Sequence, residues 1–196
     1  IPGGYSREAF VFDHAGDPVK YNNIYFTNSN QELMFRSYNC TFNKVMIANF
    51  YWSYNGSGNK YDTLLLYRAV EYRNICLNSD TVGLFESRSD CYINKNNKIT
   101  TARFFGNTTI YGSNIFDTVY FNPGNRYILE SGSTQFVNKD LQMRGNGCFP
   151  ITLQSSRSGI QATISKLSGI MTADYVQLQD QNATGGASFY AGQFSA

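Results

Sequence analysis

His14 is the only histidine of the chain and the one imidazole that it offers for acid–base catalysis. As a general base it would need a nucleophile within reach and a carboxylate that orients the ring. The sequence places only Asp13 and Asp17 beside it, in a segment whose Gly16 and Pro18 are typical of a turn. We therefore interpret His14 as a turn residue, and we predict no catalytic residues.

Two pairs of acidic residues are the next candidates for chemistry. Glu86 with Asp90, or Asp174 with Asp180, would suit a polysaccharide lyase or hydrolase if stacking aligned them with further carboxylates to bind calcium. The chain has only 14 Asp and Glu, and none of its four cysteines has the C-x2-C spacing of a zinc site. We therefore expect isolated surface carboxylates, with no metal and no cofactor.

Aromatic residues offer a binding function instead. Tyr51, Trp52, Tyr54 and Tyr61 surround a loop rich in Gly and Asn, a composition typical of platforms that stack sugars or dock proteins. The other interpretation is an inward aromatic stack capped by a long turn. Both interpretations stay open here, and these four are the candidate ligand-binding residues.

Short strands, rather than helices, must position these residues. No window keeps apolar residues at helical spacing for three turns without a Gly, Asn or Ser cluster. Segment 116–121 alternates in polarity, and a turn rich in Asn, Pro and Gly separates it from 127–130. Further strands are predicted over 24–27, 32–36, 45–51, 64–72, 82–86, 102–105, 135–143, 151–154, 162–165 and 175–179. The sequence therefore predicts an all-β fold.

A repeat along the chain indicates a solenoid. Val82, Phe105, Ile128, Ile151 and Val176 lie in predicted strands at steps of 23, 23, 23 and 25 residues, a period typical of one coil of a parallel β-helix. The 21 Asn suit its turns, because an Asn amide can bond to its equivalent one coil away. We expect one β-solenoid segment over 1–196, less regular in its N-terminal third, with irregular coils or an insertion over 1–80 and regular coils over 81–196.

The second half of the chain carries a specific order of motifs, from Phe104 to Gly192. The string FFGNTTIYGSNIFDTVYFNPGNRYILESGSTQ is followed by LQMRGNGCFPITLQSSRSGIQATISK and then by DYVQLQDQNATGGASFYAG. This order resembles the right-handed β-helix segments of large secreted surface proteins and adhesins of gliding Bacteroidota. The resemblance implies a right-handed parallel β-helix, export by gliding-associated type IX secretion, an extracellular position on the bacterial cell surface, and a non-catalytic role as a stalk or adhesin module.

The partners that the resemblance implies are neighbouring coils of the same long chain or other surface proteins, with polysaccharide as a further ligand. The competing function class is a carbohydrate-active β-helix enzyme or a carbohydrate-binding module. A net charge of +2 without a basic run favours neither nucleic acid nor a membrane surface as partner. No stretch reaches the roughly 18 apolar residues of a membrane-spanning helix. Because neither 1–4 nor 192–196 resembles a polar cap, we expect both ends to continue into further coils or to dock on a partner.

The remaining candidates are modification sites. A disulfide between Cys76 and Cys91, which lie less than one coil apart, would clip an insertion, and four reduced thiols are the alternative. Cys148 lies in the resembling turn, where we expect it to be buried and unpaired. The resemblance also marks three threonines in Asp-Thr-apolar triplets as candidates for O-glycosylation. They are Thr63, Thr81 and Thr118.

Overall fold

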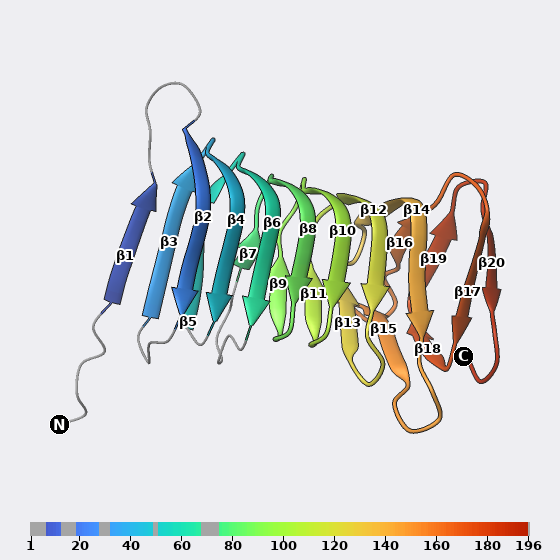
Figure 1. Cartoon of the computed structure of the whole chain (residues 1–196). Coiled ribbons are helices and arrows are strands. Elements are labelled where there is room, and N and C mark those ends of the chain that lie inside the picture. The colour runs from blue at the N-terminus through green and yellow to red at the C-terminus, as the bar shows by residue number, and fades with distance from the viewer. Residues whose placement is uncertain (1–6, 13–18, 28–31, 49–50, 68–74, 196) are drawn as a thin grey trace.

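A computed structural model describes residues 7–12, 19–27, 32–48, 51–67 and 75–195. These residues form strands, turns and loops, and they include no helix able to cross a membrane. The strands stack from the N-terminal to the C-terminal end as successive coils of one right-handed solenoid (Figure 1). Every pairing between named strands is parallel, as in the pair β8 and β10. The predicted all-β, parallel β-helix fold is therefore confirmed.

Each coil contributes to two opposed walls. One wall is an 11-stranded sheet, called here the main sheet, and the other consists of a 3-stranded and a 6-stranded sheet. The main sheet contains β2 (Lys20–Thr27), β4 (Thr41–Ala48), β6 (Lys60–Tyr67), β8 (Thr81–Ser87), β10 (Lys98–Phe104), β12 (Asn114–Phe121), β14 (Thr134–Arg144), β16 (Ala162–Ser165), β17 (Ile170–Asp174), β19 (Gln181–Thr184) and β20 (Ser188–Ala191).

The second wall consists of short strands, apart from those at its N-terminal end. Its 3-stranded sheet contains β1 (Arg7–Phe12), β3 (Glu32–Tyr38) and β5 (Tyr51–Ser57). Its 6-stranded sheet contains β7 (Ile75–Leu77), β9 (Cys91–Ile93), β11 (Thr108–Ile110), β13 (Arg126–Leu129), β15 (Ile151–Ser155) and β18 (Val176–Gln179).

Four of the main-sheet strands, β4, β6, β10 and β12, share one pattern of burial. A buried apolar residue is followed by two residues that are not buried, a second buried residue, an outward residue and a third buried residue. The two consecutive outward residues break the alternation of a flat strand. One of them is left out of the backbone pairing between strands, as are Asn43 and Asp62 between β4 and β6. The buried trios include Phe42, Val45 and Ile47 in β4, Tyr61, Leu64 and Leu66 in β6, and Ile99, Ala102 and Phe104 in β10.

The coils do not keep the 23-residue period that the sequence suggested. Val82 lies opposite Ile99, 17 residues later, and not opposite Phe105. Ile128 lies opposite Gln154, three residues beyond the expected partner Ile151. The last expected pair, Ile151 with Val176, is confirmed. Strand pairing determines which residues lie opposite one another, but it does not determine the number of residues in each coil. The turns between strands differ in length from coil to coil, so the spacing along the sequence is uneven.

The main sheet also crosses the boundary expected near residue 80. β6 pairs with β8 in parallel, with Lys60 opposite Thr81, and β4 pairs with β6 in the same way. Lys20 lies opposite Thr41, which extends the same column of residues back to β2. The described strands of 1–80 are therefore stacked like those that follow them.

A ladder of buried amide and carboxyl side chains runs along the corner that precedes the main-sheet strands. Asn59, Asp80, Asn97, Asn114 and Gln135 are each at most 3% exposed. In each of the middle three, the side-chain oxygen accepts a hydrogen bond from the backbone N–H of the previous ladder member, one coil earlier. These bonds are 2.8, 2.9 and 3.0 Å long. Gln135 Oε1 accepts from Asn114 Nδ2 at 3.1 Å. This corner ladder supplies the partners that buried backbone groups need, and it confirms the predicted role of Asn in the turns.

Aromatic rings fill the interior between the two walls. Tyr21, Phe42 and Tyr61 stack in successive coils, with ring centroids 5.3 and 5.1 Å apart. Further along, Tyr127 stacks on Phe121 at 4.1 Å. The Tyr127 hydroxyl lies 3.0 Å from the carbonyl oxygens of Phe104 and Asn122, and burial raises the pKa of this phenol.

We predict that Asn97→Leu lowers the free energy of unfolding by about 2 to 3 kcal/mol, because it leaves the buried Asp80 N–H without its acceptor and removes the side-chain hydrogen bond to Asn114 Oδ1. Asn43→Ala is the control, since its amide bonds to Asn23 on the exposed surface, and should change stability by less than about 0.5 kcal/mol. Urea unfolding followed by circular dichroism measures both. Equal losses in the two variants would contradict the role of the ladder.

A second prediction concerns the buried phenol. The folded-state pKa of Tyr127 lies above its unfolded value of about 10, so its stabilising contribution is present below pH 10 and is lost as the pH rises above it. Between pH 10 and 12 the wild type should therefore lose stability more steeply than Tyr127→Phe, by up to about 1.4 kcal/mol per pH unit. Urea midpoints across this range measure the difference, and parallel curves would show that the phenol does not contribute.

Candidate functional site

The outer face of the main sheet carries columns of side chains set by the strand register. Glu86, Arg103, Tyr120 and Gln142 lie opposite one another on β8, β10, β12 and β14. Arg103 and Gln142 are exposed and Tyr120 is half-buried, whereas Glu86 is only 7% exposed. Neighbouring strands lie about 4.8 Å apart, so this row presents one side chain per coil at a regular spacing.

Arginine side chains on this face are held by aromatic rings and by one carboxylate. The Arg103 guanidinium lies 5.3 Å from the centre of the Tyr120 ring. The Arg88 guanidinium lies 5.2 Å from the Tyr67 ring and 5.3 Å from the Phe105 ring. Because cation–π contacts of this kind are attractive, both guanidinium groups have preferred positions.

Glu86 links the two arginines. Its Oε1 accepts a hydrogen bond from Arg88 Nε at 2.8 Å, and its Oε2 lies 4.0 Å from Arg103 Nη1. The carboxylate raises the pKa of Arg88 above its ordinary value through this hydrogen bond and through its charge. One buried carboxylate therefore faces two guanidinium groups, which leaves an excess of positive charge at this point.

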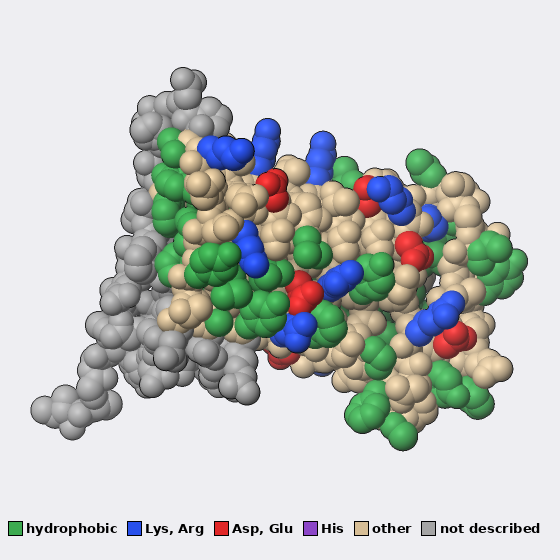
Figure 2. Space-filling view, viewed as in Figure 1, with side chains coloured by type: hydrophobic (Ala, Val, Ile, Leu, Met, Phe, Trp, Pro, Cys, Tyr) green, Lys and Arg blue, Asp and Glu red, His purple; other side chains and the backbone are tan. Residues whose placement is uncertain are grey.

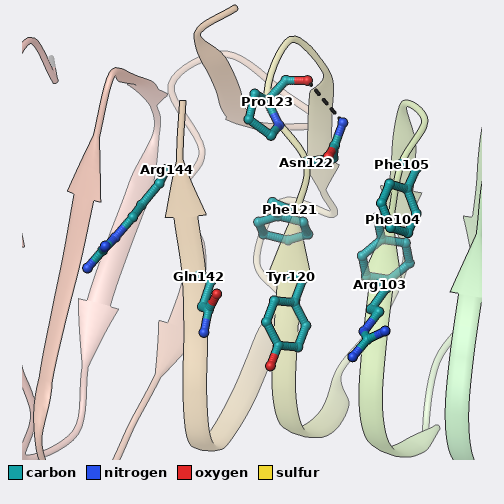
Figure 3. Close-up of a pocket in the computed structure, with 9 residues that line it drawn as sticks. All are labelled: Arg103, Phe104, Phe105, Tyr120, Phe121, Asn122, Pro123, Gln142 and Arg144. Atoms are coloured by element: carbon teal, nitrogen blue, oxygen red, sulfur yellow. Dashed lines mark hydrogen bonds between the residues drawn. The ribbon is translucent and has the colours of Figure 1, made fainter. Parts of the chain in front are cut away.

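A groove of about 320 Å³ lies beside this row. It is called here the arginine groove, and Figure 3 shows its lining side chains on three neighbouring strands. Tyr120 and Gln142 lie side by side on β12 and β14, with Arg103 on the far strand β10. Nine residues line it, and they include Arg103, Phe105, Tyr120, Asn122, Gln142 and Arg144.

The main-sheet face is basic from β2 to β14. Along the strands from β2 to β14, and including Arg88 just beyond β8, there are eight Lys and Arg but only four Asp and Glu. The chain overall has 16 Lys and Arg against 14 Asp and Glu. Figure 2 shows basic side chains distributed over this face with apolar ones between them. This part of the face therefore carries half of the Lys and Arg residues of the chain but less than a third of its Asp and Glu residues.

The structure places the four predicted ligand-binding aromatics on two different walls of the fold. Tyr61 is 3% exposed and stacks on Phe42, so its ring belongs to the core and is closed to a ligand. This is the inward aromatic stack that was the other interpretation of the cluster. Tyr51, Trp52 and Tyr54 lie on β5, opposite residues of β3, and their side chains lie outside the described residues.

The two acidic pairs have structural partners. Glu86 contacts arginines, as described above, and Asp90 accepts hydrogen bonds from the backbone and side-chain nitrogens of Asn107 at 2.8 and 3.2 Å. Asp174 accepts from the Gln193 N–H, and Asp180 accepts from the Gly159 N–H. Among the described residues no three His, Cys, Asp or Glu side chains come together as metal ligands. His14 lies outside the described residues.

The cysteines differ in exposure. Cys148 is exposed, so the expectation that it is buried was wrong. The turn between β14 and β15 projects this side chain to solvent while Asn146 Oδ1 accepts from its backbone N–H at 3.0 Å. Cys91 is buried, with its Sγ 3.6 Å from Thr108 Oγ1. Cys76 lies on β7, which pairs with β9, but its side chain is not among those described, so the disulfide stays a prediction.

The three Asp-Thr triplets occupy two different structural positions. Asp80 belongs to the corner ladder, and Thr81 beside it is exposed. Thr63 and Thr118 are half-buried members of the outward pairs in β6 and β12. The triplets thus recur for structural reasons, and O-glycosylation at these threonines stays a prediction.

Comparison with known proteins adds no assignment. No family model, no curated protein and no solved structure matches the chain. The arginine groove was not predicted from the sequence either, because Arg103, Tyr120 and Gln142 are 17 and 22 residues apart and share a row only through the strand register.

The placement of Cys148 gives a direct prediction. A thiol reagent added to the folded protein should label Cys148 within minutes, because the side chain is exposed. Buried Cys91 should not be labelled in the folded protein. Mass spectrometry of wild type and Cys148→Ser, with and without urea, measures this. Slow labelling of native Cys148 would show that the turn is closed over it.

Proposed function

We propose that the chain is a non-catalytic structural and adhesive module of a long bacterial cell-surface protein. The observation that carries this proposal is the outer face of the main sheet, where Arg103, Tyr120 and Gln142 form one row of a continuous parallel ladder. A ladder of this kind supplies a stiff scaffold. It holds ligand-contacting groups at fixed spacing without a hinge or a closing lid.

The surroundings of the acidic residues support a binding role over catalysis. A lyase or hydrolase needs a carboxylate whose acceptor atoms are open to calcium or to substrate. Here Asp90 bonds to Asn107 in the next coil, and Glu86 faces two arginines. These carboxylates have roles in stacking coils and in holding the arginines of the outer face.

The cellular setting of the proposal rests on the resemblance of the second half of the chain to surface proteins of gliding Bacteroidota. On that basis we place the module outside the cell, exported by type IX secretion, with a role in surface adhesion or gliding motility. Its partners would be neighbouring coils, other surface proteins and polysaccharide. The competing function is a carbohydrate-active β-helix enzyme.

The two functions differ in what happens to a bound polymer. We predict that residues 1–196 are retarded in native gels containing a polysaccharide, while the polymer gains no new reducing or unsaturated ends during prolonged incubation with calcium. The gel measures retention, and chemical assays of chain ends measure cleavage. Calcium-dependent cleavage would establish the enzyme instead, and the lack of retention by every polymer tested would contradict the adhesive role.

A further inference from the structure

We propose that the arginine groove binds an acidic polysaccharide, one that carries carboxylate or sulfate groups, across the strands of the main sheet. The inference rests on the proposed adhesive function and names the ligand class of that same module. It is argued from the charge of the face, from the state of its aromatic rings and from the spacing of its arginines.

Charge is the first observation. The groove is lined by Arg103 and Arg144 and by no acidic side chain. Three carboxylates lie near it. Glu86 is shared between Arg88 and Arg103, Asp140 accepts a hydrogen bond from Gln142 Nε2 at 2.8 Å, and Asp174 is the register partner of Arg144 on β17. With Arg88 included, the part of the face from β2 to β14 has eight cations against four anions, so it favours an anionic ligand.

The aromatic rings distinguish between classes of polymer. Neutral sugars and nucleic-acid bases bind to aromatic residues through open ring faces. In this groove the Tyr120 ring faces Arg103 and the Phe105 ring faces Arg88. The Tyr67 ring, outside the groove, also faces Arg88. The rings thus serve to position guanidinium groups. A positioned guanidinium is suited to bind a planar carboxylate, or a sulfate, through paired N–H donors.

Spacing favours a polymer over a small anion. Arg103 and Arg144 lie on β10 and β14, two strands apart and two residues out of register, which corresponds to a backbone separation of about 12 Å. Arg88 follows β8, one strand further away. Between the two groove arginines, the Tyr120 hydroxyl and the Gln142 amide can bond to sugar hydroxyls. Gln142 lies in the row of Arg103, and Arg144 lies two residues further along the same strand, so neutral polar groups separate the two cations. This arrangement matches a chain whose acidic groups are separated by neutral positions.

The test compares two double variants with the same change in charge. R103Q/R144Q removes both groove arginines, and K60Q/K98Q removes two exposed lysines from another row of the same face. The probes are polygalacturonate, dextran sulfate, neutral dextran and a single-stranded oligothymidylate. Affinity is measured by retardation in native gels, and thermal melting confirms that each variant folds.

We expect wild type to bind at least one of the two acidic polymers and to ignore neutral dextran. R103Q/R144Q should bind that polymer at least tenfold more weakly, whereas K60Q/K98Q should change the affinity less than threefold. Gln142→Ala, a change at an exposed position, should weaken binding without altering the charge, and it keeps the proposal testable if the arginine variant does not fold.

Four outcomes would overturn the inference. Equal losses in the two double variants would mean that charge alone, and not the groove, attracts the polymer. Stronger binding of the oligothymidylate would assign the face to nucleic acid, and stronger binding of neutral dextran would assign it to neutral glycans. If the protein retains polysaccharide equally well without Arg103 and Arg144, the arginine groove is not the binding site, although the adhesive function still stands. Cleavage of the polymer would contradict the proposed function itself.

Discussion

The corner ladder is the interaction on which the rest of the structure depends. Where each coil turns into the main sheet, backbone N–H groups are buried at a place that no strand partner reaches. Asp80, Asn97 and Asn114 supply these partners, each side chain accepting from the backbone of the coil before it. A buried N–H without a partner costs roughly 1 to 3 kcal/mol. A shift of one residue in the stacking would therefore leave several such groups unpaired, and the ladder fixes the register.

Once the register is fixed, both faces of the main sheet follow from it. On the inner face, Phe42 and Tyr61 stack ring on ring because they occupy equivalent positions in successive coils. On the outer face, the same pairing brings Arg103 beside Tyr120 and Gln142. The proposed binding surface is thus a consequence of the interior bonds, and its geometry does not depend on a mobile loop.

Much of this architecture was accessible from the sequence, but the coil length was not. Alternation predicted the strands, and the Asn content predicted amide ladders in the turns. The parallel β-helix itself was predicted from the resemblance of the second half and from a 23-residue step that the structure does not keep. The true repeat is an octet with Asn or Asp at its first position and apolar residues at positions three and six. It is visible as NKYDTLLL, DTVGLFES, NKITTARF and NIFDTVYF, which begin at 59, 80, 97 and 114. Uneven turns hide it from a search for a constant period, and without the true register the outward rows could not be found.

Individual side chains were harder to place for the same reason. Tyr61 occupies the third position of an octet, which is a core position, whereas its neighbours in sequence suggested an exposed platform. Cys148 lies in a turn outside any octet, where no periodic pattern determines its exposure. Sequence patterns thus predict residues that repeat with the coil, and they do not predict those that belong to single turns.

Distances between spin labels on one outward column test the central claim of coil stacking most directly. Positions 20 and 136 are linked by six successive register pairs, and positions 60 and 136 by four. At about 4.8 Å per coil, the two backbone separations are about 29 and 19 Å. Pulsed electron paramagnetic resonance should give mean distances that differ by about 10 Å, the height of two coils. Equal distances, or a difference far from this value, would contradict the stacked register.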